Sequence, residues 1–151
     1  MDSPLGVSPD AAATLSSMER TLVLLKPDAV RRGLVGHVLS RFEAKGLRIV
    51  AMEHRMITGE VADAHYAEHV DRDFYPPLRE FATSGPLVAL VLEGDEAISV
   101  VRALTGATDG RKADPGTIRG DLSLSNRENL VHASDSAESD DREIALWFPE
   151  L

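Results

Sequence analysis

Apolar residues are spaced along the chain in two patterns, one typical of strands and one typical of helices. Short continuous apolar runs predict buried strands at residues 21–26, 47–57, 86–92 and 130–132. Apolar residues three or four positions apart predict helices at residues 35–45, 60–69, 76–83, 95–104 and 139–148. Gly46 and Gly106 are expected to end two of these helices, and Asp28 is placed to cap the chain that follows the first strand.

The order of these elements predicts the fold class. It reads β-α-β-α-α-β-α-β-α, with a long polar segment before the last strand. Such an order is typical of a split βαβ arrangement, in which helices pack on an antiparallel sheet. We therefore expect an α+β fold, a ferredoxin-like α/β sandwich with a four-stranded antiparallel sheet covered by helices.

Length and composition are those of one domain with a short tail. Of the 151 residues, 43% are hydrophobic, which is enough for the core of a single domain. Residues 1–17 are small and polar and the ordered pattern begins at Met18, so we expect a disordered tail at 1–17 and one domain at 18–151. The chain shows no secretory signal and no apolar run of the roughly 18 residues that span a membrane. A cytoplasmic location without a membrane partner is therefore expected.

Charge and residue usage exclude several classes of function. The formal net charge is −9 at pH 7, so the surface as a whole repels nucleic acid, which is not expected as a partner. Any phosphate binding must come from a local basic cluster. The absence of cysteine excludes disulfides, thiolate metal sites and cysteine nucleophiles. The phosphate-binding glycine loops of P-loop proteins and protein kinases are also missing.

The polar segment at residues 106–129 is the first candidate for a functional region, because long aperiodic segments in small domains usually carry function. Residues suited to phosphate binding in it or beside it are Arg102, Thr108, Arg119, Asn129 and His132. Arginine binds phosphate oxygens in pairs, and hydroxyl and carboxamide groups add neutral donors. A neutral imidazole is a usable nucleophile at pH 7, and Glu143 is a candidate to hold the other ring nitrogen of His132.

Structural interpretations stay open when these residues are taken one at a time. His132 could be a hydrogen-bonded structural histidine, and Arg102 could pair with Glu93 or Glu96 on a solvated helix face. Lys26 is different, because a lysine at the end of a buried strand is unusual and favours a functional role.

A zinc site at the predicted helix 60–69 is the less favoured interpretation of its two histidines. His65 and His69 are four residues apart, a spacing that suits zinc, but the H-E-x-x-H order and a third ligand are missing. Tyr66 and Phe74, nearby in the chain, could be core aromatic residues, although the neighbours of Phe74 indicate partial exposure.

Seven short blocks occur in the order found in nucleoside diphosphate kinases. The most specific is NLVHASDS at 129–136, which resembles the family signature N-x-x-H-G-S-D. The other blocks are KPD at 26–28, HYAEH at 65–69, TSGP at 83–86, GATD at 106–109, PGTIRGD at 115–121 and REIALWFP at 142–149. Together they extend from about residue 19 to the end of the chain, so the sequence resembles this family over the whole predicted domain.

The resemblance implies a catalytic group of five residues: His132, Glu143, Lys26, Tyr66 and Ser134. His132 would become phosphorylated, Glu143 would orient its ring, and Ser134 would lie close to their hydrogen bond. Lys26 and Tyr66 would lie near the transferred phosphate. The implied reaction is ping-pong: a nucleoside triphosphate phosphorylates His132 and a nucleoside diphosphate then takes the phosphoryl group. The alternative is a non-catalytic nucleotide-binding regulatory module on the same fold.

The resemblance also implies how a nucleotide would bind. The residues concerned are Lys26, Phe74, Arg102, Thr108, Arg119 and Asn129. Arg102, Thr108 and Arg119 would hold the phosphates, while Lys26 and Asn129 would reach the ribose hydroxyls. Phe74 would stack on the base, a contact that tolerates every base because each has a π-face.

A metal ion and an oligomer are implied as well. Mg²⁺ would bridge phosphate oxygens and keep most of its waters, with no direct protein ligand and with Glu68 near those waters. Members of the family form hexamers or tetramers, and the Pro115–Gly116 loop favours a hexamer here.

The sequence departs from the family pattern in three places. Ala133 and Ala29 stand where glycine is usual. The run 122–128, between the Arg119 loop and Asn129, also differs from the usual one, with Leu122 in place of an aromatic residue. Alanine at 133 would be harmful only if the backbone there needs a positive φ or a close approach. No charged or nucleophilic side chain is lost, so an active enzyme is expected.

Overall fold

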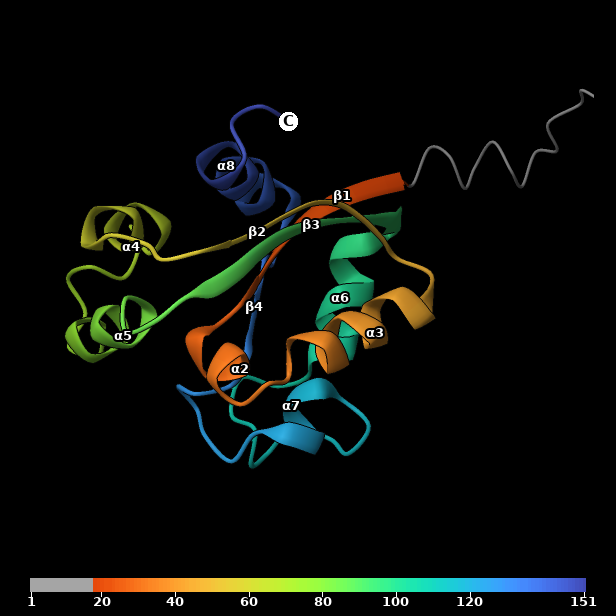
Figure 1. The fold of residues 1–151 in the computed structure, drawn as a ribbon, viewed down its shortest axis with the longest axis horizontal. Coiled ribbons are helices and arrows are strands. Elements are labelled where there is room, and N and C mark those ends of the chain that lie inside the picture. Colours follow the sequence, from red (N-terminus) through yellow and green to blue (C-terminus); the bar gives the residue numbers. More distant parts are fainter. Residues whose placement is uncertain (1–17) are drawn as a thin grey trace, which may run out of the picture.

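The computed structural model describes residues 18–151, and the tail predicted at 1–17 lies outside this part (Figure 1). Within it the strands are β1 (Met18–Leu25), β2 (Arg48–Arg55), β3 (Leu87–Asp95) and β4 (Val131–Ala133). They form one sheet in the order β2-β3-β1-β4, and every neighbouring pair is antiparallel. The predicted four-stranded antiparallel sheet is confirmed.

The helices of the described residues are α2 (Pro27–Arg31), α3 (Val35–Lys45), α4 (Gly59–His65), α5 (Tyr75–Ala82), α6 (Ala97–Thr105), α7 (Ile118–Leu122) and α8 (Ala137–Trp147). The five predicted helices are present, α3 with the predicted bounds and the other four with shifted ends. Gly46 and Gly106 end α3 and α6 as expected, and both have a positive φ. The two helices that were not predicted, α2 and α7, have five residues each, which is too short for an apolar period to be visible. The first has a proline at its N-terminus, and Thr117 caps the second.

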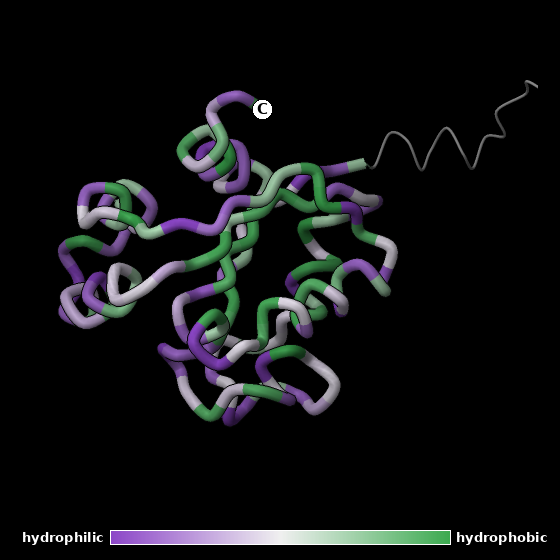
Figure 2. The backbone as a smooth tube through the Cα atoms, in the orientation of Figure 1, coloured by the Kyte–Doolittle hydropathy of each residue, from purple (hydrophilic) through white to green (hydrophobic). Residues whose placement is uncertain are grey.

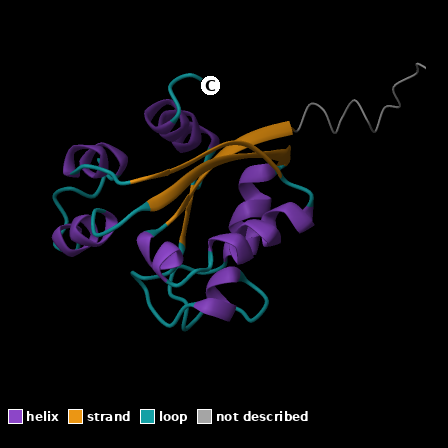
Figure 3. Ribbon diagram, viewed as in Figure 1, coloured by secondary structure: helices purple, strands orange, loops and turns teal. Residues whose placement is uncertain are grey.

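Helices cover both faces of the sheet, as Figure 3 shows. Alternate residues of β1 point to opposite faces, so Val23 and Leu25 pack under α3 and α6, while Leu22 and Leu24 pack under α4, α5 and α8. The central strands are the most hydrophobic part of the backbone in Figure 2. Both faces are buried, which explains why β1 and β3 are continuous apolar runs in the sequence.

Two local expectations were wrong. The helix predicted at 60–69 ends at His65, so His65 and His69 do not share a helical face. Asp28 does not cap the helix at 35–45: it lies inside α2, is 3% exposed, and its Oδ2 accepts a hydrogen bond from the Leu130 N–H at 3.1 Å.

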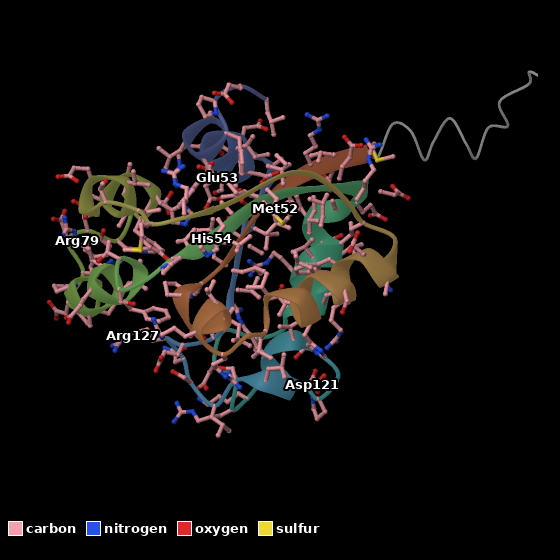
Figure 4. The ribbon with its side chains drawn as sticks, in the orientation of Figure 1. Met52, Glu53, His54, Arg79, Asp121 and Arg127 are labelled. Atoms are coloured by element: carbon pink, nitrogen blue, oxygen red, sulfur yellow. The ribbon has the colours of Figure 1, made fainter. Side chains whose placement is uncertain are left out.

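One edge strand of the sheet is β2, which carries the exposed side chains of Met52, Glu53 and His54 (Figure 4). Within residues 18–151, no helix has the length and apolar character needed to cross a membrane.

Candidate active site

An open pocket of about 740 Å³ collects nearly all of the predicted site residues. Those that line it are Lys26, Tyr66, Phe74, Arg102, Thr108, Arg119, Asn129, His132 and Glu143. Ser134 is the exception: it is 1% exposed and does not line the pocket, but its hydroxyl donates to Glu143, which does. The tertiary fold therefore brings together residues that the sequence pattern placed on separate elements.

The pairing of β4 with β1 explains how His132 and Lys26 come together. His132 lies on β4, where it is paired with Leu24 of β1, and Lys26 follows directly after β1. The Lys26 N–H donates to the Leu130 carbonyl at 2.8 Å, which joins the ends of the two strands. Because α8 packs against β1, it places Glu143 beside His132.

His132 is held through one ring nitrogen. Its Nε2 lies 2.6 Å from Glu143 Oε1, and the Ser134 hydroxyl donates to Glu143 Oε2 at 2.5 Å. Burial works to raise the pKa of Glu143, but the hydrogen bonds from His132 and Ser134 and the nearby His132 outweigh it, so the pKa lies below its ordinary value. An ionised Glu143 accepts a hydrogen bond from Nε2–H, so the lone pair of a neutral His132 lies on Nδ1.

Lys26, Arg102 and Arg119 form a basic cluster in an otherwise acidic chain. Lys26 Nζ donates to Asn129 Oδ1 at 2.7 Å. Burial and the positive charge of Arg119 lower the pKa of Lys26 to about 8, against the opposing effect of Asp28. Burial and the charge of Arg102 likewise lower the pKa of Arg119 to about 10. The repulsion among these cations would be relieved by an anion bound between them.

Arg119 is fixed by the backbone around the pocket. Its guanidinium donates to the carbonyls of Asn129, Gly106 and Val131 at 3.2, 3.0 and 2.5 Å. A guanidinium has five N–H groups, so donors remain for a ligand once these bonds are made. The arrangement presents a pre-positioned cation, which suits a phosphate site.

Arg102 is an exposed residue of α6 that lines the pocket. Its Nη1 donates to the Ala133 carbonyl at 3.3 Å. Among the described residues it makes no ion pair with Glu93 or Glu96, and Glu93 instead accepts from two other arginines at 2.8 and 2.7 Å. The solvated-pair interpretation of Arg102 is therefore wrong.

Aromatic side chains line the outer part of the pocket. Phe74 is 50% exposed, with the His69 ring centroid 5.5 Å away, and it offers a flat apolar surface. Tyr66 packs edge-to-face against His65, and burial raises its pKa, so its hydroxyl remains a hydrogen-bond donor at neutral pH. Thr108 is exposed, and its carbonyl accepts from the Asn129 carboxamide at 2.8 Å.

His65 is a residue of the site whose position the sequence did not reveal. Its ligand atom and those of His132 and Glu143 lie within 4.8 Å of one another, a grouping with the composition of a metal site. His69, the expected partner of His65 for zinc, lies instead beside Tyr66 and Phe74. No spacing rule could have paired His65 with His132, because they come from a helix and a strand that are distant in the chain.

The two alanines that replace family glycines lie in ordinary backbone. Ala133 is in β4 and Ala29 is in α2, and neither has a positive φ. The non-glycine residues with positive φ in the described chain are Glu96 and Leu130. Leu130 (φ 73°), two residues before His132, is held by its bonds to Asp28 and Lys26, so the strained position at this site is a leucine.

Comparison with known proteins identifies the family. The family model described as nucleoside diphosphate kinase matches residues 19–151. The chain is 76% identical over 132 residues to a nucleoside diphosphate kinase of Nocardioides sp., covering 87% of this chain and 98% of that protein. It is 62% identical over 137 residues to the one of Cutibacterium acnes, covering 91% and 99%.

Solved structures agree. A nucleoside diphosphate kinase of Halobacterium salinarum in complex with CDP superposes with a TM-score of 0.85 at 48% identity, over 87% of this chain and 88% of that chain. The enzyme of Encephalitozoon cuniculi gives a TM-score of 0.84 at 38% identity, over 86% and 88%. The ferredoxin-like architecture is thereby confirmed, and the chain belongs to the nucleoside diphosphate kinase family of nucleotide-binding phosphotransferases.

Proposed function

We propose that this enzyme transfers the terminal phosphoryl group of a nucleoside triphosphate, usually ATP, to a nucleoside diphosphate through a phosphohistidine at His132. Such a reaction would maintain the cellular pools of NTPs and dNTPs. The observation that carries the proposal is the 2.6 Å contact of His132 Nε2 with Glu143. It leaves Nδ1 as the nucleophilic atom of a ring that lines the same pocket as Lys26 and Arg119.

The reaction would consist of two successive phosphoryl transfers. In the first, the Nδ1 lone pair of His132 attacks the γ-phosphorus, the bond to the β–γ bridging oxygen breaks, and the diphosphate leaves with that electron pair. In the second, a terminal oxygen of another nucleoside diphosphate attacks the same phosphorus and the P–N bond breaks. Glu143 would stabilise the positive charge that develops on the ring in the first step, and Ser134 would hold Glu143.

The pocket residues would bind the nucleotide as the sequence predicts. Arg102, Thr108 and Arg119 would hold the phosphates, which carry most of the charge to be neutralised. Lys26 and Asn129, already hydrogen-bonded to each other, would reach the ribose, and Lys26 would also approach the transferred phosphate. Tyr66 would lie near that phosphate, and the exposed face of Phe74 would stack on the base.

Enzymes of this family require a divalent cation. We propose Mg²⁺, because it prefers oxygen ligands and retains waters. Besides Glu143, which holds His132, the carboxylates that line the pocket are those of Glu68 and Asp135. The nucleotide phosphates would hold the ion, with no direct protein ligand. When bound it would neutralise phosphate charge.

The proposal is tested by incubating the protein with γ-³²P-labelled ATP and Mg²⁺ without an acceptor. We expect an acid-labile, alkali-stable label that GDP removes and converts to GTP. The variant His132→Ala should take no label and keep its fold. His37→Ala, an exposed histidine of α3, is the matched control and should be labelled like the wild type. A wild-type protein that binds ATP but takes no label would contradict the proposal and support the regulatory-module alternative.

The two other functions considered have less support. A non-catalytic module would have no need of the Lys26, His132 and Glu143 arrangement described above. A primary role in nucleic-acid binding conflicts with the net charge of −9. Binding to a labelled oligonucleotide that weakens steeply with salt would be required to revive it.

The assembly, domain limits and location are also proposals. We propose a homohexamer in preference to a tetramer, on the resemblance of the Pro115–Gly116 loop to that of hexameric relatives. We propose residues 18–151 as the kinase domain, in line with the family match to residues 19–151. A cytoplasmic location would suit an enzyme acting on free nucleotides.

A further inference from the structure

His65 is a buried histidine beside the proposed nucleophile that the reaction described above does not use. It is the last residue of α4, and its side chain is 1% exposed. Its Nδ1 lies 3.0 Å from Nε1 of Trp147, a residue that is 2% exposed. The indole N–H can only donate, so Nδ1 must accept, and a neutral His65 must carry its proton on Nε2.

The Nε2–H group of His65 lies near the carboxylate of Glu143. It has no hydrogen-bond partner within residues 18–151, and Glu143 Oε1 lies 3.5 Å from it. This is the same oxygen that holds His132 Nε2 at 2.6 Å. The rings of His65 and His132 also pack edge-to-face, with centroids 4.5 Å apart and planes at 80°. A buried donor left without a partner is uncommon and unfavourable, which indicates that its position serves another state of the site.

The same hydrogen bond argues against a metal ion held by His65, His132 and Glu143. A metal needs a lone pair on His65 Nε2, and that atom carries the proton as long as Trp147 donates to Nδ1. Burial and the nearby His132 lower the pKa of His65 to about 3, so His65 is neutral at the pH of the cell. The cluster therefore presents a neutral N–H donor to the carboxylate.

We propose that His65 is a positioning residue whose Nε2–H, fixed by Trp147, bonds to Glu143 Oε1 and keeps the carboxylate aligned with His132 while the phosphoryl group moves. The inference rests on the proposed function of His132. Glu143 would then be held at both oxygens by groups other than the nucleophile, by Ser134 at Oε2 and by His65 at Oε1. Hydrogen bonds at catalytic sites often shorten during the reaction, and a separation of 3.5 Å leaves a short distance to close.

Neutrality is part of the role. During attack on phosphorus the ring of His132 becomes positively charged, and a cation 4.5 Å away would oppose that charge. A neutral donor orients Glu143 without competing for its negative charge as a second cation would. Burial keeps His65 neutral, and the hydrogen bond from Trp147 fixes its tautomer, so both serve this end.

Two isosteric substitutions separate positioning from simple packing. His65→Gln places an amide N–H near the Nε2 position, within reach of Glu143. His65→Asn keeps a polar atom near the Nδ1 position for Trp147 and has no donor that reaches Glu143. We expect His65→Asn to slow His132 phosphorylation in a single turnover by about ten- to hundredfold. Its nucleotide Kd should stay within about twofold, since the loss is confined to the transition state.

We expect His65→Gln to restore the rate to within about threefold of wild type, because the donor to Glu143 is retained. A rescue by asparagine in place of glutamine would overturn the proposal, since His65 would then serve only as a partner for Trp147. Equal rates in both folded variants and in the wild type would overturn it too. If the wild type itself forms no phosphohistidine, the proposed function fails, and that outcome is distinct from any difference between the variants.

A spectroscopic measurement tests the tautomer without relying on activity. ¹⁵N NMR of the imidazole should show His65 in the Nε2–H form in the wild type. Trp147→Phe removes the indole donor but keeps an aromatic ring, and we expect a mixture of tautomers and slower phosphorylation of His132. A wild-type His65 protonated on Nδ1 would overturn the assignment.

Discussion

Glu143 is a buried carboxylate with both oxygens engaged, one by His132 and the other by Ser134. Its pKa lies below the ordinary carboxyl value, since these partners outweigh the effect of burial. As pH falls the unfolded chain therefore takes up the proton first. The stability contributed by the ionised carboxylate is complete above its unfolded pKa and is lost as pH falls through its folded pKa.

The first prediction follows for Glu143→Gln. At pH 7 the variant should be less stable than the wild type by about 1–3 kcal/mol, and the difference in Tm should narrow as the pH is lowered through the acidic range. Thermal unfolding at a series of pH values measures it. Glu138→Gln, an exposed change on the same helix, is the control and should show no such trend. A constant difference across pH would contradict the assignment.

Lys26 provides a second prediction, on binding. Its pKa is lowered to about 8 by burial and by Arg119, so at pH 8 about half of the free enzyme has a neutral lysine. Nucleotide phosphates favour the charged form, so binding near pH 8 should take up protons, and affinity should weaken as the pH rises above 8. Calorimetry in two buffers of different ionisation enthalpy measures the uptake. Lys26→Arg should abolish it, because arginine stays charged.

At the scale of elements, the segment that joins α6 to α7 has to meet a tight geometric demand. Gly106 has φ +89°, and a Cβ there would lie 2.4 Å from Thr117 Oγ1. Thr117 caps α7 by accepting the Gly120 N–H, and α7 carries Arg119, which donates to the Gly106 carbonyl. A short helix with little apolar surface is thus held in place by this close approach.

The third prediction is that Gly106→Ala displaces α7. We expect a loss of stability of about 1–3 kcal/mol in urea and a weaker Kd for ADP, because Arg119 moves with the helix. Gly36→Ala is the matched control: it lies in α3 with open space around a Cβ, and should stabilise by about 0.5–1 kcal/mol with ADP binding unchanged. Equal ADP affinity in both variants would count against the role given to α7.

The sequence predicted the long elements well and the short ones poorly. Helices such as α3 and α6 and the buried strands have enough residues for an apolar period to appear. The five-residue helices α2 and α7 and the early end of α4 are decided by proline, a side-chain cap and packing, which leave little periodic signal. The interpretation of Asp28 as a helix cap was wrong for a different reason. Its hydrogen-bond partner, Leu130, is distant in the chain, so no local pattern could reveal the contact.

At the scale of the whole molecule, an acidic protein concentrates positive charge in one pocket. The net charge is −9, yet Lys26, Arg102 and Arg119 face the same space. The repulsion among these cations raises the free energy of the free enzyme, and bound phosphates would remove this repulsion.

The fourth prediction concerns assembly. We expect light scattering at micromolar protein to give six times the chain mass of 16.3 kDa. A charged substitution in the Pro115–Gly116 loop, such as Pro115→Glu, should lower that mass, because symmetry would bring the like charges of neighbouring subunits together and they would repel one another. A dimeric mass for the wild type would refute the hexamer.

By itself the sequence determined the order of the long elements, the fold class, the family and the identity of ten candidate site residues, because periodicity and ordered motifs are local properties of the chain. Nine of those residues line one pocket, with Ser134 beneath Glu143. Only the tertiary structure placed His65 against Glu143, assigned its proton through Trp147, and fixed Leu130 through Asp28. These contacts join segments that are far apart in the chain and meet through sheet pairing and helix packing, so no local pattern could contain them.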